Sequence, residues 1–128
     1  MDWGIFILNT ILQDQEIEYT KENAKAVFDK GNYPLAKTIL ETLWNSSSKD
    51  NVYLLYDYGQ ALRKTKESII FVEICRELYG NQNIMSNKWI ISTLCWCLYE
   101  CYIRNYSVDD KDGFNDFIKR AEYIINNC

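Results

Sequence analysis

Five cysteines are the side chains of this chain best suited to bind a soft metal ion or to act as a nucleophile. They are Cys75, Cys95, Cys97, Cys101 and Cys128. On a helix, Cys97 and Cys101 share a face, whereas Cys95 points about 200° away from Cys97. A tetrahedral zinc site needs four ligands, which usually come from Cys-x-x-Cys elements on separate segments. This spacing therefore predicts no metal ion and no cofactor, and it indicates reduced thiols that pack as small apolar side chains.

Histidine is absent from the sequence. Its absence removes the usual general base near neutral pH, together with Ser-His-Asp and Cys-His catalysis. Acidic residues gather at Asp109, Asp110 and Asp112. They lack the length and the closing glutamate of a calcium-binding loop, and we interpret them as a solvated turn ahead of a helix. The sequence therefore predicts no catalytic residues and a protein that is not an enzyme.

The chain is acidic, with a net charge of −4 and a pI of about 4.8. Nonspecific binding to DNA or RNA requires a positive surface that releases counterions from phosphates, so we expect no direct nucleic-acid partner. No apolar run reaches the ~20 residues that span a bilayer, and Met1-Asp2 lacks the basic start of a signal peptide. We expect a cytoplasmic protein without a membrane partner.

Apolar residues recur with the spacing of amphipathic helices from about residue 20 onward. Thr20 is suited to cap the first helix, and Gly31-Asn32 to end it. Residues 80–83 are expected to form a loop, and residues 1–16 a short helix, with a strand as the alternative. The other expected helices lie at about residues 20–30, 34–44, 52–64, 67–79, 87–105 and 113–126.

The fifth of these six helices is apolar nearly all round, which is typical of a buried helix. Base-stacking surfaces use aromatic residues, but they need more cationic neighbours than this helix has. We therefore assign its aromatic side chains to the core, with an exposed tyrosine edge that could contact a partner. These aromatic residues are Trp89, Trp96, Tyr99, Tyr102 and Tyr106.

The six expected helices form three pairs, and similar motifs recur from pair to pair. The segment from Ala24 to Leu40, with Gly31-Asn32-Tyr33 at its turn, resembles the second half of a tetratricopeptide repeat. Tyr58-Gly59 followed by Leu62 resembles the first half of the next repeat. Gly59 follows Ala24 by 35 residues, and both begin the small-residue face of a helix.

A third repeat is indicated by Trp89, Thr93 and Trp96, whose spacing is similar to the tryptophan, small residue and aromatic residue of that family. The resemblance extends over about residues 18–127. Two positions depart from the family pattern. Lys66 occupies the second turn where glycine is usual, and Phe71 stands where a small packing residue is usual.

In the tetratricopeptide family, each helix pair buries its apolar face against its neighbours, and the first helices line a concave partner-binding groove. The resemblance implies a single all-α domain over residues 1–128. It would consist of about three tandem antiparallel helix hairpins with a short N-terminal segment docked on them. A non-repetitive bundle of five to seven helices is the alternative.

The resemblance also implies which residues line the groove. Lys21, Lys25 and Arg63 would form a cationic patch suited to an acidic or carboxylate-ended segment. The alternative for any single charge is a solvated helix face. The full set of partner-binding residues that we expect is Lys21, Lys25, Phe28, Tyr53, Tyr56, Gln60, Arg63 and Lys64.

The leading functional hypothesis is an adaptor that binds another protein or a peptide segment in this groove. The alternative is a small acidic inhibitor of the phage or mobile-element type. Such a protein would occlude a basic surface of a nucleic-acid or defence enzyme by charge complementarity. The open ends of a short repeat stack could also pair two copies into a homodimer.

Overall fold

A computed structural model describes residues 17–104 and 112–126, and every regular element in these ranges is a helix. The expected all-α class is therefore confirmed for this part of the chain. The expected N-terminal segment at residues 1–16 and the acidic residues 109–110 lie outside it. The helices are α2 (Lys21–Asp29), α3 (Tyr33–Asn45), α4 (Val52–Lys64), α5 (Ser68–Glu77), α6 (Gln82–Met85), α7 (Lys88–Ile103) and α8 (Asp112–Asn126).

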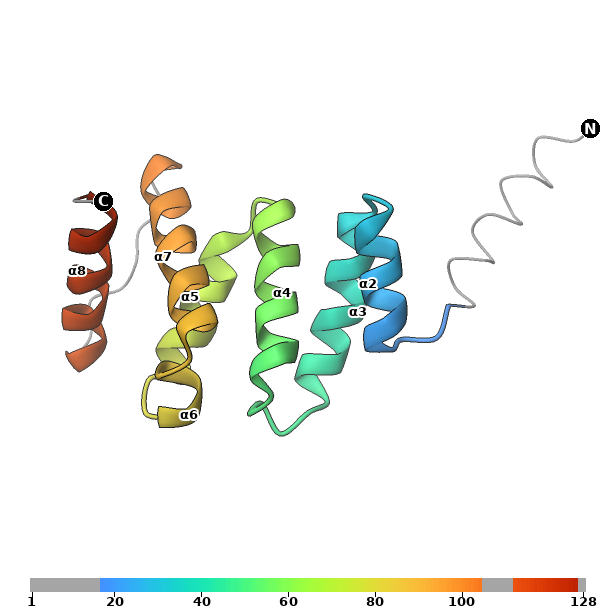
Figure 1. Ribbon diagram of the computed structural model, residues 1–128, viewed down its shortest axis with the longest axis horizontal. Coiled ribbons are helices and arrows are strands. Elements are labelled where there is room, and N and C mark those ends of the chain that lie inside the picture. The colour runs from blue at the N-terminus through green and yellow to red at the C-terminus, as the bar shows by residue number, and fades with distance from the viewer. Residues whose placement is uncertain (1–16, 105–111, 127–128) are drawn as a thin grey trace, which may run out of the picture.

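These helices lie in a row along the long axis of the molecule (Figure 1). The helices α2, α3, α4 and α5 pack in sequence order, each against the next. Helix α7 packs against both α4 and α5, and α8 packs against α7. Two helices that are far apart in the sequence, α4 and α7, are therefore neighbours. Within the described ranges, no helix combines the length and the apolar character that crossing a bilayer requires.

Asparagine side chains fix where α4 and α7 begin. Asn51 Oδ1 accepts a hydrogen bond from the backbone nitrogen of Tyr53 at 3.0 Å, and Asn87 Oδ1 accepts one from Trp89 at 3.0 Å. Such N-caps satisfy amide groups that have no partner inside the helix, and each typically stabilises a helix by about 1 kcal/mol. The matched caps place Tyr53 and Trp89 at the same position, the second residue of their helices.

The turns that follow α2 and α4 share one backbone geometry. Gly31 has a φ angle of 86° and Lys66 one of 62°, so both are left-handed. In each turn, the next amide donates to the carbonyl five residues earlier, from Asn32 at 2.9 Å and from Glu67 at 2.8 Å. This is the Schellman arrangement that ends many helices. Lys66 therefore occupies a backbone position that favours glycine.

Replacing Lys66 with glycine should raise the free energy of unfolding by about 0.5–1 kcal/mol. A left-handed residue with a Cβ costs about 1–2 kcal/mol, and the greater freedom of glycine in the unfolded chain offsets about 0.4–1 kcal/mol of that gain. Urea unfolding followed by circular dichroism would measure the change. Lys66→Ala is the control, since it removes the charge and keeps the strain. Equal stability of the two variants would contradict a strained turn.

Residues 82 and 83 are helical, so the loop expected at residues 80–83 is wrong over those two positions. They belong to the short helix α6. The Asn81 side chain caps this helix by accepting a hydrogen bond from the amide of Ile84 at 3.3 Å. Ile84 is fully buried and anchors the turn to the core. The burial of Ile84 explains why the mostly polar segment Gln82–Met85 forms a helical turn instead of a loop.

The core between α4, α5 and α7 depends on the absence of a side chain at Gly59. A Cβ at this position would lie 2.7 Å from Phe71 Cε2 and 3.1 Å from Thr93 Cγ2. Phe71 is fully buried on α5. The large side chain of Phe71 is therefore matched by a glycine on the facing helix.

Candidate partner-binding face

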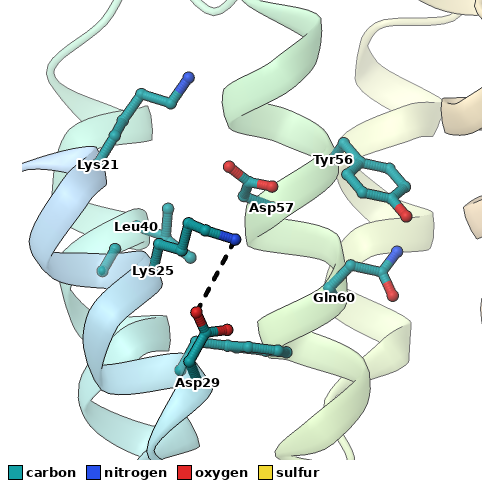
Figure 2. A pocket seen from close by; sticks show the side chains of 9 residues that line it. Lys21, Lys25, Asp29, Leu40, Tyr56, Asp57 and Gln60 are labelled. Atoms are coloured by element: carbon teal, nitrogen blue, oxygen red, sulfur yellow. Dashed lines mark ion pairs between the residues drawn. The ribbon is translucent and has the colours of Figure 1, made fainter.

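A pocket of about 200 Å³ opens between α2 and α4 (Figure 2). Its buried lining is apolar, from Ala24 on α2 and Leu40 on α3. The volume is below the ~300–1,000 Å³ typical of sites for drug-sized ligands. It is suited to one long side chain of a partner. The remaining lining residues are Lys21, Lys25, Phe28, Asp29, Tyr56, Asp57 and Gln60.

Five of the residues expected from the sequence come together around this pocket. Lys21, Lys25 and Phe28 reach it from α2, and Tyr56 and Gln60 reach it from α4. Within each helix these residues are three or four positions apart, so they share one face of that helix. The two faces line opposite sides of the pocket.

The four charged side chains that line the pocket differ in the contacts that they make. Lys25 Nζ lies 3.8 Å from Asp29 Oδ2, and both side chains are exposed, at 80% and 61%. An exposed pair of this kind contributes little. Lys21 Nζ lies 5.9 Å from the centre of the Tyr53 ring. Asp57 points toward α2 (Figure 2) and makes no hydrogen bond or ion pair within the described part of the chain.

Burial raises the pKa of Asp57 above its usual value, and the charges of Lys21 and Lys25 only partly offset this effect. Asp57 is nevertheless an exposed residue, so its carboxylate keeps contact with water and loses only part of its solvation. The sequence-based set of contact residues did not include Asp57, because one acidic residue on a helix face carries no signal of its own.

Arg63 lies on the side of α4 that faces α7. Its Nε donates to Glu100 Oε1 at 2.5 Å, and its Nη1 donates to Gln60 Oε1 at 3.3 Å. Its guanidinium carbon also lies 5.3 Å from the centre of the Trp96 ring. The structure thus brings Lys21 and Lys25 together, but it places the charge of Arg63 against a carboxylate of α7.

Lys64, the last of the expected contact residues, does not line the pocket. Its ammonium group lies 5.5 Å from the centre of the ring of Tyr33 at the start of α3. A cation above an aromatic face is stabilised by about 0.5–1 kcal/mol at an exposed site. Lys64 is therefore engaged at the end of α4, away from the pocket.

Aromatic rings continue the surface from the pocket onto α7. The ring centre of Trp89 lies 6.1 Å from that of Tyr53 and 6.4 Å from that of Tyr56. Trp96 follows along α7 beside Arg63. We name Tyr53, Tyr56, Trp89 and Trp96 the aromatic face. All four side chains are exposed, which is uncommon for a cluster of large rings.

Assignment of the α7 aromatic residues to the core was wrong for Trp89 and Trp96, whereas the exposed edge expected for the tyrosines is present at Tyr99 and Tyr102. Trp89 is 48% exposed and Trp96 is 52% exposed, and Tyr99 and Tyr102 are also exposed. Only one side of α7 meets α4 and α5, and that side is already filled. Its buried residues are Ile90, Thr93, Leu94, Cys97, Leu98 and Cys101.

A signal for the exposed tryptophans was present in the sequence. Seven residues span almost two turns of a helix, so Trp89 and Trp96 fall on one face. The stripe that contains Ile90, Leu94 and Cys97 falls on another. The face with Ile90, Leu94 and Cys97 packs against the neighbouring helices. The face with the two tryptophans is therefore left toward solvent.

The cysteines of the described part behave as small apolar side chains, as expected. Cys75, Cys97 and Cys101 are buried and form no disulfide. Burial raises the pKa of Cys101 to about 11 and that of Cys97 further. Thiols of this kind are poor nucleophiles near neutral pH. The described residues contain no group of three side chains that could hold a metal ion.

Comparison of the chain with protein-family models, with curated proteins and with solved structures gives no match.

Proposed function

We propose that this protein is an interaction module of tetratricopeptide-like helix hairpins that binds a segment of another protein. The segment would lie across the pocket and the aromatic face, on the first helices of three pairs, α2, α4 and α7. Repeated local geometry supports the hairpin arrangement. The left-handed residues Gly31 and Lys66 are 35 residues apart, and the capping residues Asn51 and Asn87 are 36 residues apart.

The aromatic face is the observation that carries the proposal. Tyr53, Tyr56 and Trp89 form an exposed cluster beside a pocket with an apolar lining. Tyrosine and tryptophan are enriched where proteins bind one another, because they supply large contact areas with few rotatable bonds. Exposed clusters of this kind commonly mark a surface that a partner covers.

Selection of random linear peptides displayed on phage would test the proposal. We expect the wild-type protein to select peptides, and Tyr56→Ala to weaken their binding by about tenfold or more, as for a central aromatic contact. Because Tyr56 is still 36% exposed, its removal should cost less than the about 3–5 kcal/mol of a fully buried ring, and the protein should remain folded. Fluorescence anisotropy would measure the binding.

Tyr102→Ala is the matched control, since Tyr102 is 78% exposed and does not belong to the aromatic face. It should bind the selected peptides with unchanged affinity. If Tyr56→Ala and Tyr102→Ala both bind as the wild type does, or if no peptide is selected, the proposed function is wrong.

A further inference from the structure

The guanidinium group of Arg63 is anchored where α4, α5 and α7 meet. Its Nε donates to Glu100 Oε1 at 2.5 Å, and its Nη1 donates to Gln60 Oε1 at 3.3 Å. The other oxygen of Glu100 accepts a hydrogen bond from Ser68 Oγ at 3.3 Å, and Ser68 is fully buried. Only 28% of the Arg63 side chain and 17% of the Glu100 side chain are exposed. Because charge-assisted hydrogen bonds are directional, these contacts fix the plane of the guanidinium group.

Gln60 connects this anchored group to the other tryptophan of the aromatic face. Its Nε2 donates to Thr93 Oγ1 at 3.1 Å, and Thr93 Oγ1 donates to the carbonyl oxygen of Trp89 at 2.8 Å. Thr93 is buried, so water competes little for these hydrogen bonds. Polar networks whose members are satisfied in this way make their surroundings rigid. The network therefore holds α4 and α7 together next to the aromatic face.

The ring of Trp96 lies against the anchored guanidinium group. The guanidinium carbon of Arg63 is over this ring, 5.3 Å from its centre. The Tyr99 ring packs edge to face with Trp96, at a centre-to-centre distance of 6.1 Å and an angle of 84°. Exposed side chains usually change rotamer within nanoseconds, whereas a guanidinium plane attracts the face of an indole ring. Arg63 and Tyr99 therefore restrict the orientation of Trp96, and about half of its surface stays open to a partner.

We propose that Arg63 is a positioning residue of the partner-binding surface. It holds the Trp96 ring in the orientation that the bound segment contacts. Immobilising a side chain on binding costs free energy, and a ring that is already held in place does not incur that cost again. This inference rests on the proposed function. It gives Arg63 a different role from the direct contact with an acidic segment that the sequence suggested.

Arg63→Lys separates the planar guanidinium group from its charge. A lysine can still pair with Glu100, but its ammonium group has no planar face to lie against Trp96. We expect the peptides selected from the random library to bind Arg63→Lys about three- to tenfold more weakly than the wild type, since one side chain must now be ordered on binding. Trp96→Ala should itself weaken binding. In that background Arg63→Lys should cause little further loss, because Arg63 acts through the missing ring.

Fluorine NMR of the full chain labelled with fluorotryptophan would report on the Trp96 ring in the free protein. Trp96→Phe would assign the Trp96 resonance among those of the four tryptophans. Arg63→Lys should move this resonance toward the position of a freely solvated indole. The resonance of Trp44 should stay in place, because Trp44 is buried on α3. An unchanged Trp44 resonance would also show that the variant is folded.

Lys37→Met is the matched control for the loss of a partly buried ion pair. Lys37 Nζ lies 3.1 Å from Glu67 Oε2, and its side chain is 23% exposed, which is close to the value for Arg63. This pair joins α3 to the start of α5, whereas Arg63 joins α4 to α7. Lys37→Met should therefore change neither the Trp96 resonance nor the affinity for the selected peptides.

The outcomes separate this inference from the proposed function, which Tyr56→Ala tests. The positioning role is wrong if Arg63→Lys keeps the affinity and the Trp96 resonance of the wild type. A loss of affinity without a shift of the resonance would mean that Arg63 contacts the segment directly. A shift without a loss of affinity would mean that the segment does not use Trp96, and equal weakening in Lys37→Met would mean that any lost ion pair suffices.

Each of these results overturns the positioning role, and the proposed function stands as long as Tyr56→Ala loses binding. Binding that is indifferent to Tyr56→Ala, or a library that yields no peptide, would overturn both.

Discussion

Phe71→Ala should lower the free energy of unfolding by about 3–5 kcal/mol, the usual cost of removing a buried aromatic ring. Phe71 is 0% exposed and fills the space above Gly59 between α4 and α5. Small domains are typically stable by only about 5–15 kcal/mol, so the loss would remove a large share of the total. Urea unfolding monitored by circular dichroism would measure it. Tyr102→Ala, which removes an exposed ring, should change the same quantity by no more than about 0.5 kcal/mol.

Gly59 provides a sharper test of the same contact. Gly59→Ala should destabilise the wild-type protein by about 1–3 kcal/mol, because its Cβ would lie 2.7 Å from the Phe71 ring. In a Phe71→Leu background the ring is absent, and the alanine should cost less. A double-mutant cycle of the two positions would report this coupling. Additive effects would mean that Gly59 and Phe71 are not packed as the structure places them.

Glu100→Gln should lower the free energy of unfolding by about 1.5–3 kcal/mol, the range for hydrogen bonds to charged groups. The Glu100 carboxylate accepts from Arg63 Nε at 2.5 Å and from Ser68 Oγ at 3.3 Å, and it lies 3.8 Å from Arg104. It therefore joins α7 to the end of α4 and to the start of α5. The glutamine keeps the shape but removes the charge, which leaves the partly buried Arg63 uncompensated.

Lys25→Gln is the comparison for this prediction. It also breaks an ion pair, with Asp29, but both partners are largely exposed. Exposed pairs contribute about 0–1 kcal/mol. If Glu100→Gln proved no more costly than Lys25→Gln in the same urea titration, the polar contacts between α4 and α7 would not hold those helices together.

Local signals in the sequence predicted most helices well. The bounds of α4 match the expected residues 52–64, because Asn51 caps its start and a left-handed residue follows its end. Such signals lie within a few residues of the boundary that they determine. The sequence did not predict helix α6. This short helix depends on the packing of Ile84 into the core, and the local sequence pattern does not show that packing.

The site was only partly predictable for the same reason. Spacing within α2 and α4 was enough to find Lys25 and Tyr56, which do line one pocket. The neutralisation of Arg63 by Glu100 depends on α4 lying beside α7, and those residues are 37 apart in the sequence. A single sequence shows the sign of each charge, whereas the partner of each charge depends on how the helices pack.

The two asparagine caps bear on the entropy of recognition. Tyr53 and Trp89 each sit one residue past the start of a capped helix, where the backbone is held by the side chains of Asn51 and Asn87. Each ring has only two torsion angles to lose, so this side of a complex is largely preorganised. A docking segment would then contribute nearly all of the ordering cost. Restricting the conformations of the free segment would therefore raise its binding affinity more than additional contacts would.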